Sequence, residues 1–472
     1  QGGIIMGLRI NHNINAINAG RQLRMNNKSL SDSLQKLSSG FRINKGADDP
    51  SGLTISEKLR AQLSGLHQGV ENSQNAMNVI GTAEGSLNEM NELLRSIRDL
   101  AVHSANEGTV DDEQLEADQA EIDSAINSIN RIANTTKYGD KYLLNGNQAF
   151  GTSGVSDSDI DTLEIYRAQF GSGSDFTVNY SIDTVAERAQ VTGVGAATAT
   201  GDATLQISGA YGSEQISIAS GTSAADVASA INAVSDNTGV QATTADDLTL
   251  ESTEYGSDYN VNIEVLSTNN GGFSEGNDEG VDIDGSINGA DAVGDGLTLS
   301  IDNSAFAGEI NFTEAAGTSA STSHSFTVDE QGMKFQLGDK TNPNEQESFG
   351  IRNVNAYNLG VDSGRLSEIK TGGAYDMKTD PDTAVDIIDE AINDISSLRA
   401  RLGAFQVNTL ETNINSLGVA IENITASESR IRDVDFASET ASFTKAQILV
   451  QAGTSIAAQA NLASQNVLQL LG

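Results

Sequence analysis

The chain has 472 residues, with 65 acidic and 27 basic side chains, no cysteine and no tryptophan. The formal net charge of −38 excludes nucleic acid as a partner, because phosphate backbones are bound by clustered Lys and Arg. The lack of cysteine excludes disulfides, zinc–thiolate centres and thiol nucleophiles. No apolar run reaches the ~20 residues of a membrane-spanning helix, so we expect no membrane insertion.

The first third of the chain has the pattern of amphipathic helices, because apolar residues recur three or four positions apart. The stripe positions are Leu30, Leu34, Leu37 and Phe41; Ile55, Leu59, Leu63, Leu66 and Val70; Met90, Leu93, Ile97 and Leu100; and Ile122, Ile126 and Ile129. At a rise of ~1.5 Å per residue, a helix over 53–106 would be roughly 80 Å long. The pattern therefore predicts an elongated building block.

The stretch GFRINKGADDP separates the first two helical patterns. A phosphate-binding loop needs four residues between its glycines and then Lys and Ser or Thr after the second glycine. Here five residues intervene, and Ala47 and Asp48 follow, where the acids would repel phosphate. We interpret it as a joint: Gly40 and Gly46 interrupt the helix, and Asp48 or Asp49 caps the next one. Pro50 takes its first position, where a missing N–H costs nothing.

The middle of the chain, 159–352, alternates apolar and polar residues between Gly, Ser and Asn turns, as half-buried strands do. Strand order and one short helix at 224–234 predict a small α+β module over 203–266. From 189 to 333 there are 22 acidic side chains and no Lys or Arg. These like charges predict a solvated, self-repelling surface.

The acidic stretch 278–296 is the best candidate for a metal site. A calcium loop of the helix-loop-helix type needs acids at its first, third and fifth positions, glycine at the sixth and Glu at the twelfth. Asp282 and Asp284 fit, but Ser286 holds the fifth position, Gly285 lies two places early and Val293 holds the twelfth. A surface loop without specific calcium binding is the favoured interpretation.

No cofactor, metal or catalytic site is predicted. A zinc-binding helix needs paired histidines, which do not occur, and a serine hydrolase needs a Gly-x-Ser-x-Gly turn between a strand and a helix. The match to that turn at 272–276 lies in a Gly-, Asn- and acid-rich stretch with no helical pattern after it. The histidines are scattered, at His12, His67, His103 and His324. We therefore expect a protein that is not an enzyme.

The C-terminal end repeats the helical pattern. Its stripe positions are Val385, Ile388, Ile392, Ile395, Leu398, Leu402 and Phe405, then Leu410, Ile414, Leu417, Ile421 and Ile424, and a last helix follows over 436–471. Asp380 and Pro381 repeat the cap of the joint at the first of these helices. Narrow stripes are marginal alone, so the two ends of the chain should pack together. The predicted fold class is a multidomain chain with a long α-helical coiled coil or bundle from both ends and a central β-rich, α+β region.

Several long motifs resemble bacterial flagellin. They are NHNINAINAGRQL, KLSSGFRINKGADDPSGLTISEKLR and EGSLNEMNELLRSIRDLAVHSANEGT at one end, and ARLGAFQVNTLETNINSL, ASESRIRDVDFASETASFTKAQIL and QANLASQNVLQLLG at the other. In the middle, only 203–266 is similar to a small insert of flagellins and hook-associated proteins. The resemblance implies a structural subunit that polymerises head to tail into the helical flagellar filament for swimming.

The resemblance also implies a division of the chain into five segments. Residues 1–49 and 432–472 correspond to inner-tube helices that become ordered on assembly. Residues 50–188, with long helices and a β-hairpin, and 341–431 correspond to the two parts of the rod domain. Residues 189–340 correspond to the variable, β-rich outer region.

Partners and location follow from the resemblance as well. It implies a homopolymer, contacts with the filament cap and the hook-filament junction proteins, and an export chaperone bound to 436–471. It implies an extracellular subunit that leaves by flagellar type III export without a cleaved signal peptide. Residues 1–18 do not have the order of a secretory signal.

A receptor patch can be carried over only in part. In flagellins recognised by the vertebrate Toll-like flagellin receptor, the patch has an Arg, a Leu four residues later and a Glu on the next helix. Leu100 and Glu121 match this pattern, but Ser96 stands at the Arg position, with Arg95 beside it and Arg98 nearby. The patch should still serve contacts between subunits.

Two alternatives to a filament subunit are considered. A hook-filament junction protein shares these termini, and electron microscopy separates the two because only flagellin grows long filaments. A secreted calcium-dependent adhesin would use the acidic middle, and a chelator would then melt that region and spare the helical ends.

Overall fold

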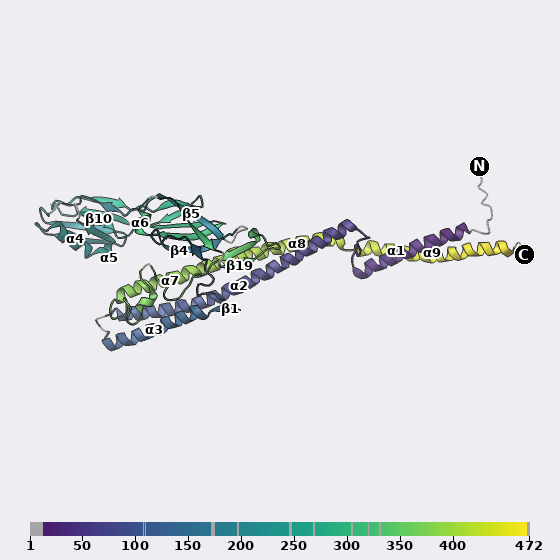
Figure 1. Ribbon diagram of the computed structural model, residues 1–472, viewed down its shortest axis with the longest axis horizontal. Helices are drawn as coiled ribbons and strands as arrows, with labels where there is room; N and C mark the ends of the chain where they lie inside the picture. Colours follow the sequence, from purple (N-terminus) through teal and green to yellow (C-terminus); the bar gives the residue numbers. More distant parts are fainter. Residues whose placement is uncertain are drawn as a thin grey trace. The chain divides into compact units, whose positions relative to one another are not determined.

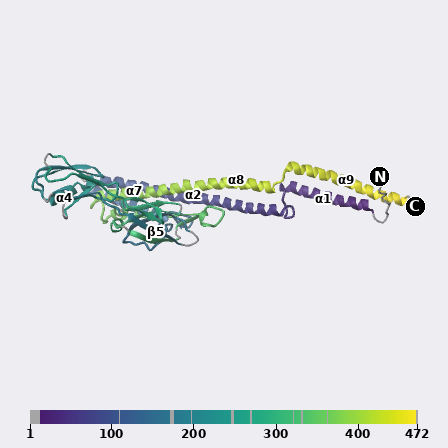
Figure 2. The same cartoon turned by 90° about the horizontal axis from the view of Figure 1, so that it is seen from above.

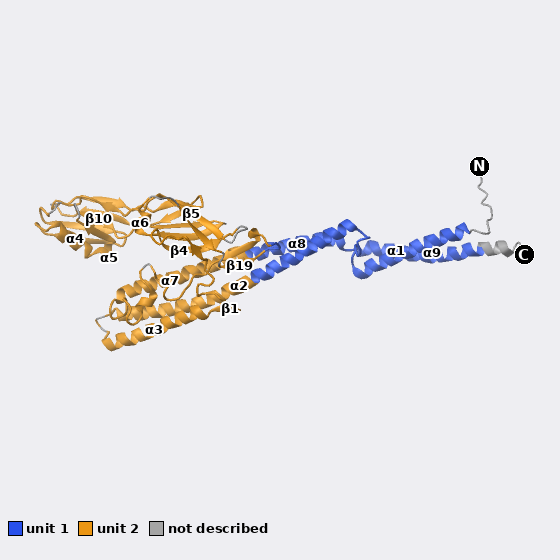
Figure 3. Cartoon of the chain, in the orientation of Figure 1, with its two compact units in different colours: residues 1–74, 338–340, 411–472 blue, residues 75–337, 341–410 orange. Residues whose placement is uncertain are grey.

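The computed structural model describes residues 13–469 except 107, 109, 171–174, 196–197, 245–247, 268–269, 304, 320, 330–331 and 362. His12 lies outside the described residues. The chain divides into two compact units (Figure 3). Unit 1 comprises 1–74, 338–340 and 411–472, and unit 2 comprises 75–337 and 341–410. Each unit therefore combines segments from both halves of the chain.

Unit 1 is built from helices of both chain ends. α1 (Ile14–Ser39) and α9 (Phe436–Gln469) lie side by side (Figures 1 and 2). The first part of α2 (Pro50–Ser104) packs on α8 (Thr412–Arg432), where the Ser56 hydroxyl donates to the Glu428 carboxylate at 3.0 Å. Each of these assemblies consists of only two helices, so a large part of the surface of each helix stays exposed to solvent.

Unit 2 contains a helical core formed by three helices. The second part of α2 packs with α3 (Asp112–Thr135) and α7 (Pro381–Ala404). A π-helical turn, η3 (Phe405–Glu411), follows α7 directly and leads into α8. The buried stripe of this core follows the three-to-four spacing of the sequence, and its members on the three helices include Ile80, Leu87, Met90, Leu94, Ile97, Ile122, Ile126, Ile129, Ile387, Ile388 and Ile395.

Short hairpins and turns cover this helical core. The hairpins are β1 (Lys137–Tyr138) with β2 (Lys141–Tyr142), and β19 (Met333–Gln336) with β20 (Gln346–Phe349). The turns are the 3-10 helices η1 (Pro343–Glu345) and η2 (Leu366–Ile369).

Unit 2 also contains two antiparallel sheets that share one core, with strand orders β14-β13-β5-β18-β3 and β15-β16-β17-β4. Three fully buried phenylalanines, Phe306, Phe312 and Phe326, lie in this core. The strands, with the short helix α6 (Glu314–Gly317), are β3 (Thr152–Ser153), β4 (Ile160–Ala168), β5 (Asp175–Thr184), β13 (Asp284–Ile287), β14 (Ala290–Asp291), β15 (Val293–Asp295), β16 (Thr298–Asp302), β17 (Phe306–Phe312) and β18 (Ser321–Asp329).

The remaining core of unit 2 belongs to a small α+β module with sheets β12-β11-β7-β8 and β6-β10-β9. Its elements are β6 (Gln190–Val191), β7 (Ala203–Gly209), β8 (Ser213–Ile218), α4 (Ala224–Asn232), α5 (Ser235–Thr238), β9 (Val240–Thr243), β10 (Thr249–Ser252), β11 (Asn260–Val265) and β12 (Gly276–Glu279).

The predicted fold class is confirmed, because long helices from both ends accompany a strand-rich middle. The expectation of a plain surface loop over 278–296 is wrong. That stretch contributes to strands β12 to β15, and its Asn288-Gly289 pair turns β13 into β14 with both residues at positive φ, 54° and 76°. Such a pair suits a two-residue hairpin, and few apolar residues mark the strands.

No helix in the described part of the chain is long and apolar enough to cross a membrane.

Candidate assembly surface and ionic cluster

The terminal helix pair, α1 with α9, leaves large apolar side chains in solvent. Ile17 on α1 is 60% exposed and Ile456 on α9 is 59% exposed. The other exposed members on these helices are Ile14, Met25, Leu34, Phe436, Ile448, Leu449 and Leu462. Among the described residues of α1, only Ser33 is buried. The pair therefore presents apolar surface on more than one side, which is unusual for an isolated folded chain.

The joint, residues 40–52, begins where α1 ends. Gly40 adopts the left-handed conformation with φ 77°, and its N–H donates to the Lys36 carbonyl at 2.9 Å. The Gly40 carbonyl then accepts from the Val434 N–H at 3.0 Å. The Arg432 guanidinium lies 4.7 Å from the centre of the Phe41 ring. The joint is thus tied to the segment between α8 and α9.

Asp48 and Asp49, the two aspartates of the joint, stabilise different parts of it. The Asp48 carboxylate accepts from the N–H groups of Asn44 and Lys45 at 3.0 and 2.9 Å and closes the turn that contains Gly46. Asp49 accepts from the Gly52 N–H at 2.9 Å, and Pro50 begins α2. Asp49, and not Asp48, therefore supplies the cap of α2.

The second predicted cap lies at the start of α7. The Asp380 carboxylate accepts from the Thr383 N–H at 3.1 Å and from the Thr383 hydroxyl at 2.7 Å. Pro381 is the first residue of the helix. Asp380 and Pro381 thus occupy the same capping positions as Asp49 and Pro50.

The proposed contact patch lies on α2 and α3 in unit 2. Arg95, Ser96 and Glu121 are exposed, whereas Leu100 is half-buried against the helical core. Leu100 therefore stabilises the core as well as contributing surface. No hydrogen bond or ion pair within the described part of the chain joins these side chains into one site.

Arg98 was predicted to belong to this patch, but its side chain contacts α7. Its guanidinium forms two hydrogen bonds with the Asp389 carboxylate on α7, one of them 3.0 Å long. Hydrogen bonding to Asp389 raises the pKa of Arg98. Arg98 thus links α2 to α7.

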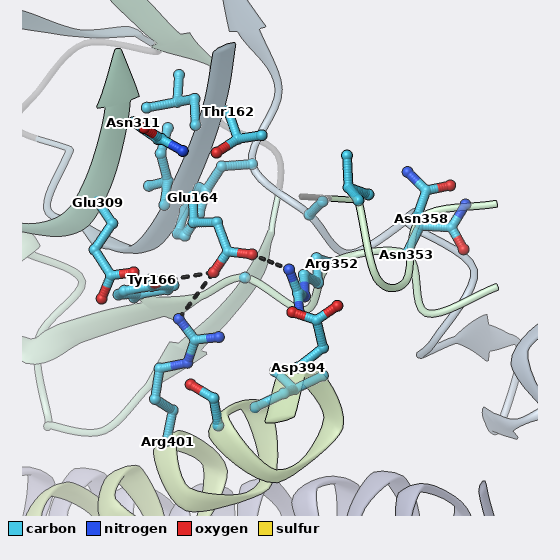
Figure 4. Close-up of a pocket in the computed structure, with 18 of the residues that line it drawn as sticks. Thr162, Glu164, Tyr166, Glu309, Asn311, Arg352, Asn353, Asn358, Asp394 and Arg401 are labelled. Carbon is cyan, nitrogen blue, oxygen red and sulfur yellow. Dashed lines mark hydrogen bonds and ion pairs between the residues drawn. The ribbon is translucent and has the colours of Figure 1, made fainter. Parts of the chain in front are cut away.

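An ionic cluster joins β4 to α7 within unit 2, and we define it as Glu164, Tyr166, Arg352, Asp394 and Arg401 (Figure 4). The Glu164 carboxylate forms ion pairs with Arg352 and, at 3.2 Å, with Arg401. Arg352 also pairs with Asp394 at 2.7 Å, and the Tyr166 hydroxyl donates to Glu164 at 2.8 Å. The Arg401 guanidinium stacks 3.6 Å from the centre of the Tyr166 ring.

The ionic cluster lies in a cavity of ≈ 660 Å³, but its charges are already paired with one another. Burial, followed by the Glu164 charge, raises the pKa of Tyr166. Burial alone would lower the pKa of Arg352, but Glu164 and Asp394 outweigh it and raise the pKa. The arrangement therefore suits a fixed cross-link between strand and helix better than general acid-base chemistry.

The carboxylate of Asp282, a candidate calcium ligand, already accepts hydrogen bonds from other groups of the protein. Its carboxylate accepts from the N–H and hydroxyl of Ser257, at 2.9 and 2.5 Å, and from the Gly296 N–H at 3.0 Å. Burial raises the pKa of Asp282, but these hydrogen bonds outweigh it and hold the pKa below its usual range. Asp284 is exposed on β13. Among the described residues, no group of three or more His, Asp or Glu side chains could hold a metal ion.

Sequence reasoning missed the ionic cluster and the turn η3. Glu164 and its two arginines lie far apart in the chain, so no spacing rule joins them. The turn η3 did leave a signal, because the apolar spacing lengthens to five residues between Phe405 and Leu410.

Family models match both ends and part of the middle. The bacterial flagellin N-terminal helical region matches 10–149, the bacterial flagellin C-terminal helical region matches 385–471, and the flagellin hook IN motif matches 204–254. The first two contain the joint, the terminal helix pair and most of the helical core.

Similar chains cover nearly the full length. The chain is 31% identical to flagellin of Clostridium tyrobutyricum, over 97% of this chain and 100% of the relative. It is 31% identical to flagellin of Bacillus subtilis, over 98% and 100%, and 30% identical to polar flagellin B/D of Vibrio parahaemolyticus, over 99% and 100%. The solved structure of flagellar hook associated protein-3 from Legionella pneumophila is 12% identical over 79% of this chain and 98% of that chain, with a TM-score of 0.32.

The helical ends, the strand-rich middle and full-length relatives agree, and the chain belongs to the bacterial flagellin family, whose members are structural subunits of the flagellar filament.

Proposed function

We propose that this subunit polymerises by burying the exposed apolar side chains of the terminal helix pair against neighbouring copies. The observation that supports this is the set of isoleucines, leucines and methionine that α1 and α9 leave in solvent. Full burial of such a side chain gives ~1.5–3 kcal/mol, so a half-exposed one has about 1 kcal/mol still to gain. Several of these contacts per subunit contribute to the free energy that drives assembly.

The finer assignments implied by the resemblance are part of the same proposal. Residues 1–49 and 432–472 form the inner tube, 50–188 and 341–431 the rod domain, and 189–340 the outer region. The role is structural and not catalytic. The subunit acts outside the cell after type III export without a cleaved signal peptide, and an export chaperone holds 436–471 beforehand.

The filament cap and the hook-filament junction proteins are the proposed partners at the filament ends. Contact with other subunits is proposed for Arg95, Leu100 and Glu121. For the vertebrate flagellin receptor, Ser96 removes one of the expected charges, so we propose weaker recognition than that of flagellins with Arg at this position.

A substitution at Ile456 tests the assembly proposal. The variant Ile456→Asp places a charge in the apolar surface of α9, so we expect a soluble monomer whose polymerisation on filament seeds is strongly reduced. Light scattering and sedimentation measure this. The control Gln451→Asp adds the same charge at an exposed polar position of α9 and should polymerise like the parent chain. Equal polymerisation of both variants would contradict the proposal.

A further inference from the structure

The turn η3 interrupts an otherwise regular run of helix from 381 to 432. Before it, apolar residues of α7 follow the α-helical spacing up to Leu402 and Phe405. From Leu410, near the end of η3, the same spacing resumes through Ile414 and Leu417 of α8. Between Phe405 and Leu410 the step is five residues long, which is one more than an α-helix allows on one face.

The π-helical conformation resolves this mismatch. In a π-helix the hydrogen bonds join residues five apart, so Phe405 and Leu410 can face the same side. Both are buried, with Leu410 fully inaccessible to solvent. Val407, between them, is 53% exposed. The run therefore contains one residue more than its apolar stripe requires, and η3 accommodates it.

Contacts on the N-terminal side of η3 are strong. The Phe405 ring lies 4.9 Å from the ring of Phe349 and 6.3 Å from the ring of Phe335, measured between centres. One turn earlier, Arg401 is held by Glu164 of the ionic cluster. On the C-terminal side, none of the described residues of α8 is fully buried. The turn is thus attached at its start by ring contacts and continues into α8, which is held by a half-buried face and by hydrogen bonds to α2 such as that from Asn413 to the Ser73 hydroxyl at 3.1 Å.

We propose that η3 is a flexure in the filament subunit: a one-residue excess that lets the helical run open locally or change register at Phe405–Glu411 while the apolar stripes on both sides stay packed. Sharp changes of helix direction concentrate at such π turns, because their hydrogen bonds are less regular than those of an α-helix. This inference goes beyond assembly itself, and its first test uses the monomer alone.

Deletion of Val407 is the decisive variant. It shortens the step between Phe405 and Leu410 to four residues, so the run can become α-helical throughout with both stripes in place. We expect a folded monomer with a melting temperature equal to or above that of the parent chain. Amide hydrogens at 405–411 should exchange more slowly by at least about tenfold, because the local opening is suppressed. Filaments of this variant should be stiffer, with a longer persistence length in electron micrographs.

Two controls separate register from side-chain effects. Deletion of Glu422, an exposed residue of α8, removes a residue where the spacing is already α-helical, so it should rotate the stripe out of place and lower the melting temperature. The variant Val407→Ala keeps the chain length and should behave like the parent in exchange and stiffness.

The outcomes decide between alternatives. If deletion of Val407 destabilises the monomer as much as deletion of Glu422, the chain holds no excess residue and the proposal fails. It also fails if the deletion variant folds but shows the exchange rates and filament stiffness of the parent. A folded deletion variant that exchanges slowly yet cannot polymerise would support a need for the flexure during assembly, whereas failure of the assembly proposal alone would leave the monomer result intact.

Discussion

At the scale of single residues, Gly52 shows how closely the joint is packed. A Cβ atom at this position would lie 2.4 Å from the Asp49 carboxylate and 2.7 Å from the Ile43 side chain. Ile43 is 1% exposed, so it has little room to move. Glycine is therefore needed here for close approach, although it weakens an α-helix by ~0.5–1 kcal/mol.

Substitution of this glycine should destabilise the joint. In Gly52→Ala, overpacking costs ~1–3 kcal/mol, and the better helix propensity of alanine offsets at most ~1 kcal/mol of that. We expect a lower melting temperature in far-UV circular dichroism. Gly81 is the matched control in α2, because no described atom lies within 4 Å of its would-be Cβ. Gly81→Ala should raise the melting temperature, and a rise in both variants would show that the joint is loosely packed.

At the scale of secondary-structure elements, the ionic cluster connects the strand-rich and helical parts of unit 2. Glu164 on β4 is the shared acceptor for Arg352, for Arg401 of α7 and for the Tyr166 hydroxyl. Its side chain is 24% exposed. Removal of this one charge leaves two arginines without their main counter-ion in a poorly hydrated place, and such removal is costly.

The variant Glu164→Gln should therefore be less stable than the parent by ~1–3 kcal/mol, with partial exposure keeping the loss below that of a fully buried pair. Chemical denaturation monitored by tyrosine fluorescence measures this. Asp302 forms a comparable ion pair with Arg167, but its side chain is 82% exposed. Asp302→Asn should cost less than ~1 kcal/mol. Similar losses in the two variants would mean that Glu164 has no special role.

Sequence patterns predicted some elements far better than others. Residues three to four apart marked α2, α3 and α7, because their stripes face one continuous core. The alternation in 203–209 marked β7, which is half-buried. By contrast β12 and β13, with the sequences GNDE and DGSI, have almost no apolar residues, so their strand character comes from hydrogen bonding to neighbours and not from their own pattern.

The functional features were predictable from the sequence only where their residues lie close together in the chain. The caps at Asp49 and Asp380 were visible because capping is local in the chain. The ionic cluster was invisible because β4, Arg352 and α7 meet only in the folded chain. The turn η3 has a signal in the sequence, the five-residue step, but the apolar stripes on both sides of it have the spacing of an ordinary α-helix and so do not predict the turn.

At the scale of the whole molecule, acid stability depends on carboxylates in both units. The N–H groups of Lys45 and then Asn44 hold the pKa of Asp48, in unit 1, below its usual range. In unit 2, the Thr379 hydroxyl lowers the pKa of Asp376, and together with backbone N–H groups it outweighs burial. A folded pKa below the unfolded value of about 3.9 contributes stability above that pH. This stability is lost as the pH falls through the folded pKa.

We therefore expect the melting temperature to fall steeply below about pH 4. Asp48→Asn and Asp376→Asn should each be less stable than the parent at pH 7, and the difference should disappear at low pH, where the parent is also uncharged at these positions.

Asp386 provides the opposite case. Burial, and then the charge of Asp389, raises the pKa of Asp386, so Asp386→Asn should be more stable at pH 7. If Asp48→Asn or Asp376→Asn is less stable than the parent by the same amount at low pH as at pH 7, the lowered pKa assigned to that aspartate is wrong.

The uneven distribution of basic residues has a consequence for proteolysis. Arg188 and Lys334 border a stretch that contains the whole core of the small α+β module and part of the core shared by the two larger sheets, but no Lys or Arg. Trypsin cleaves after basic side chains, so it has no cleavage site inside this stretch, even when the stretch is unfolded. Digestion should therefore release a single long, strongly anionic peptide from Ala189 to Lys334. Any chemical modification of the Ser or Thr hydroxyls in this region would then appear as a mass shift of that one fragment.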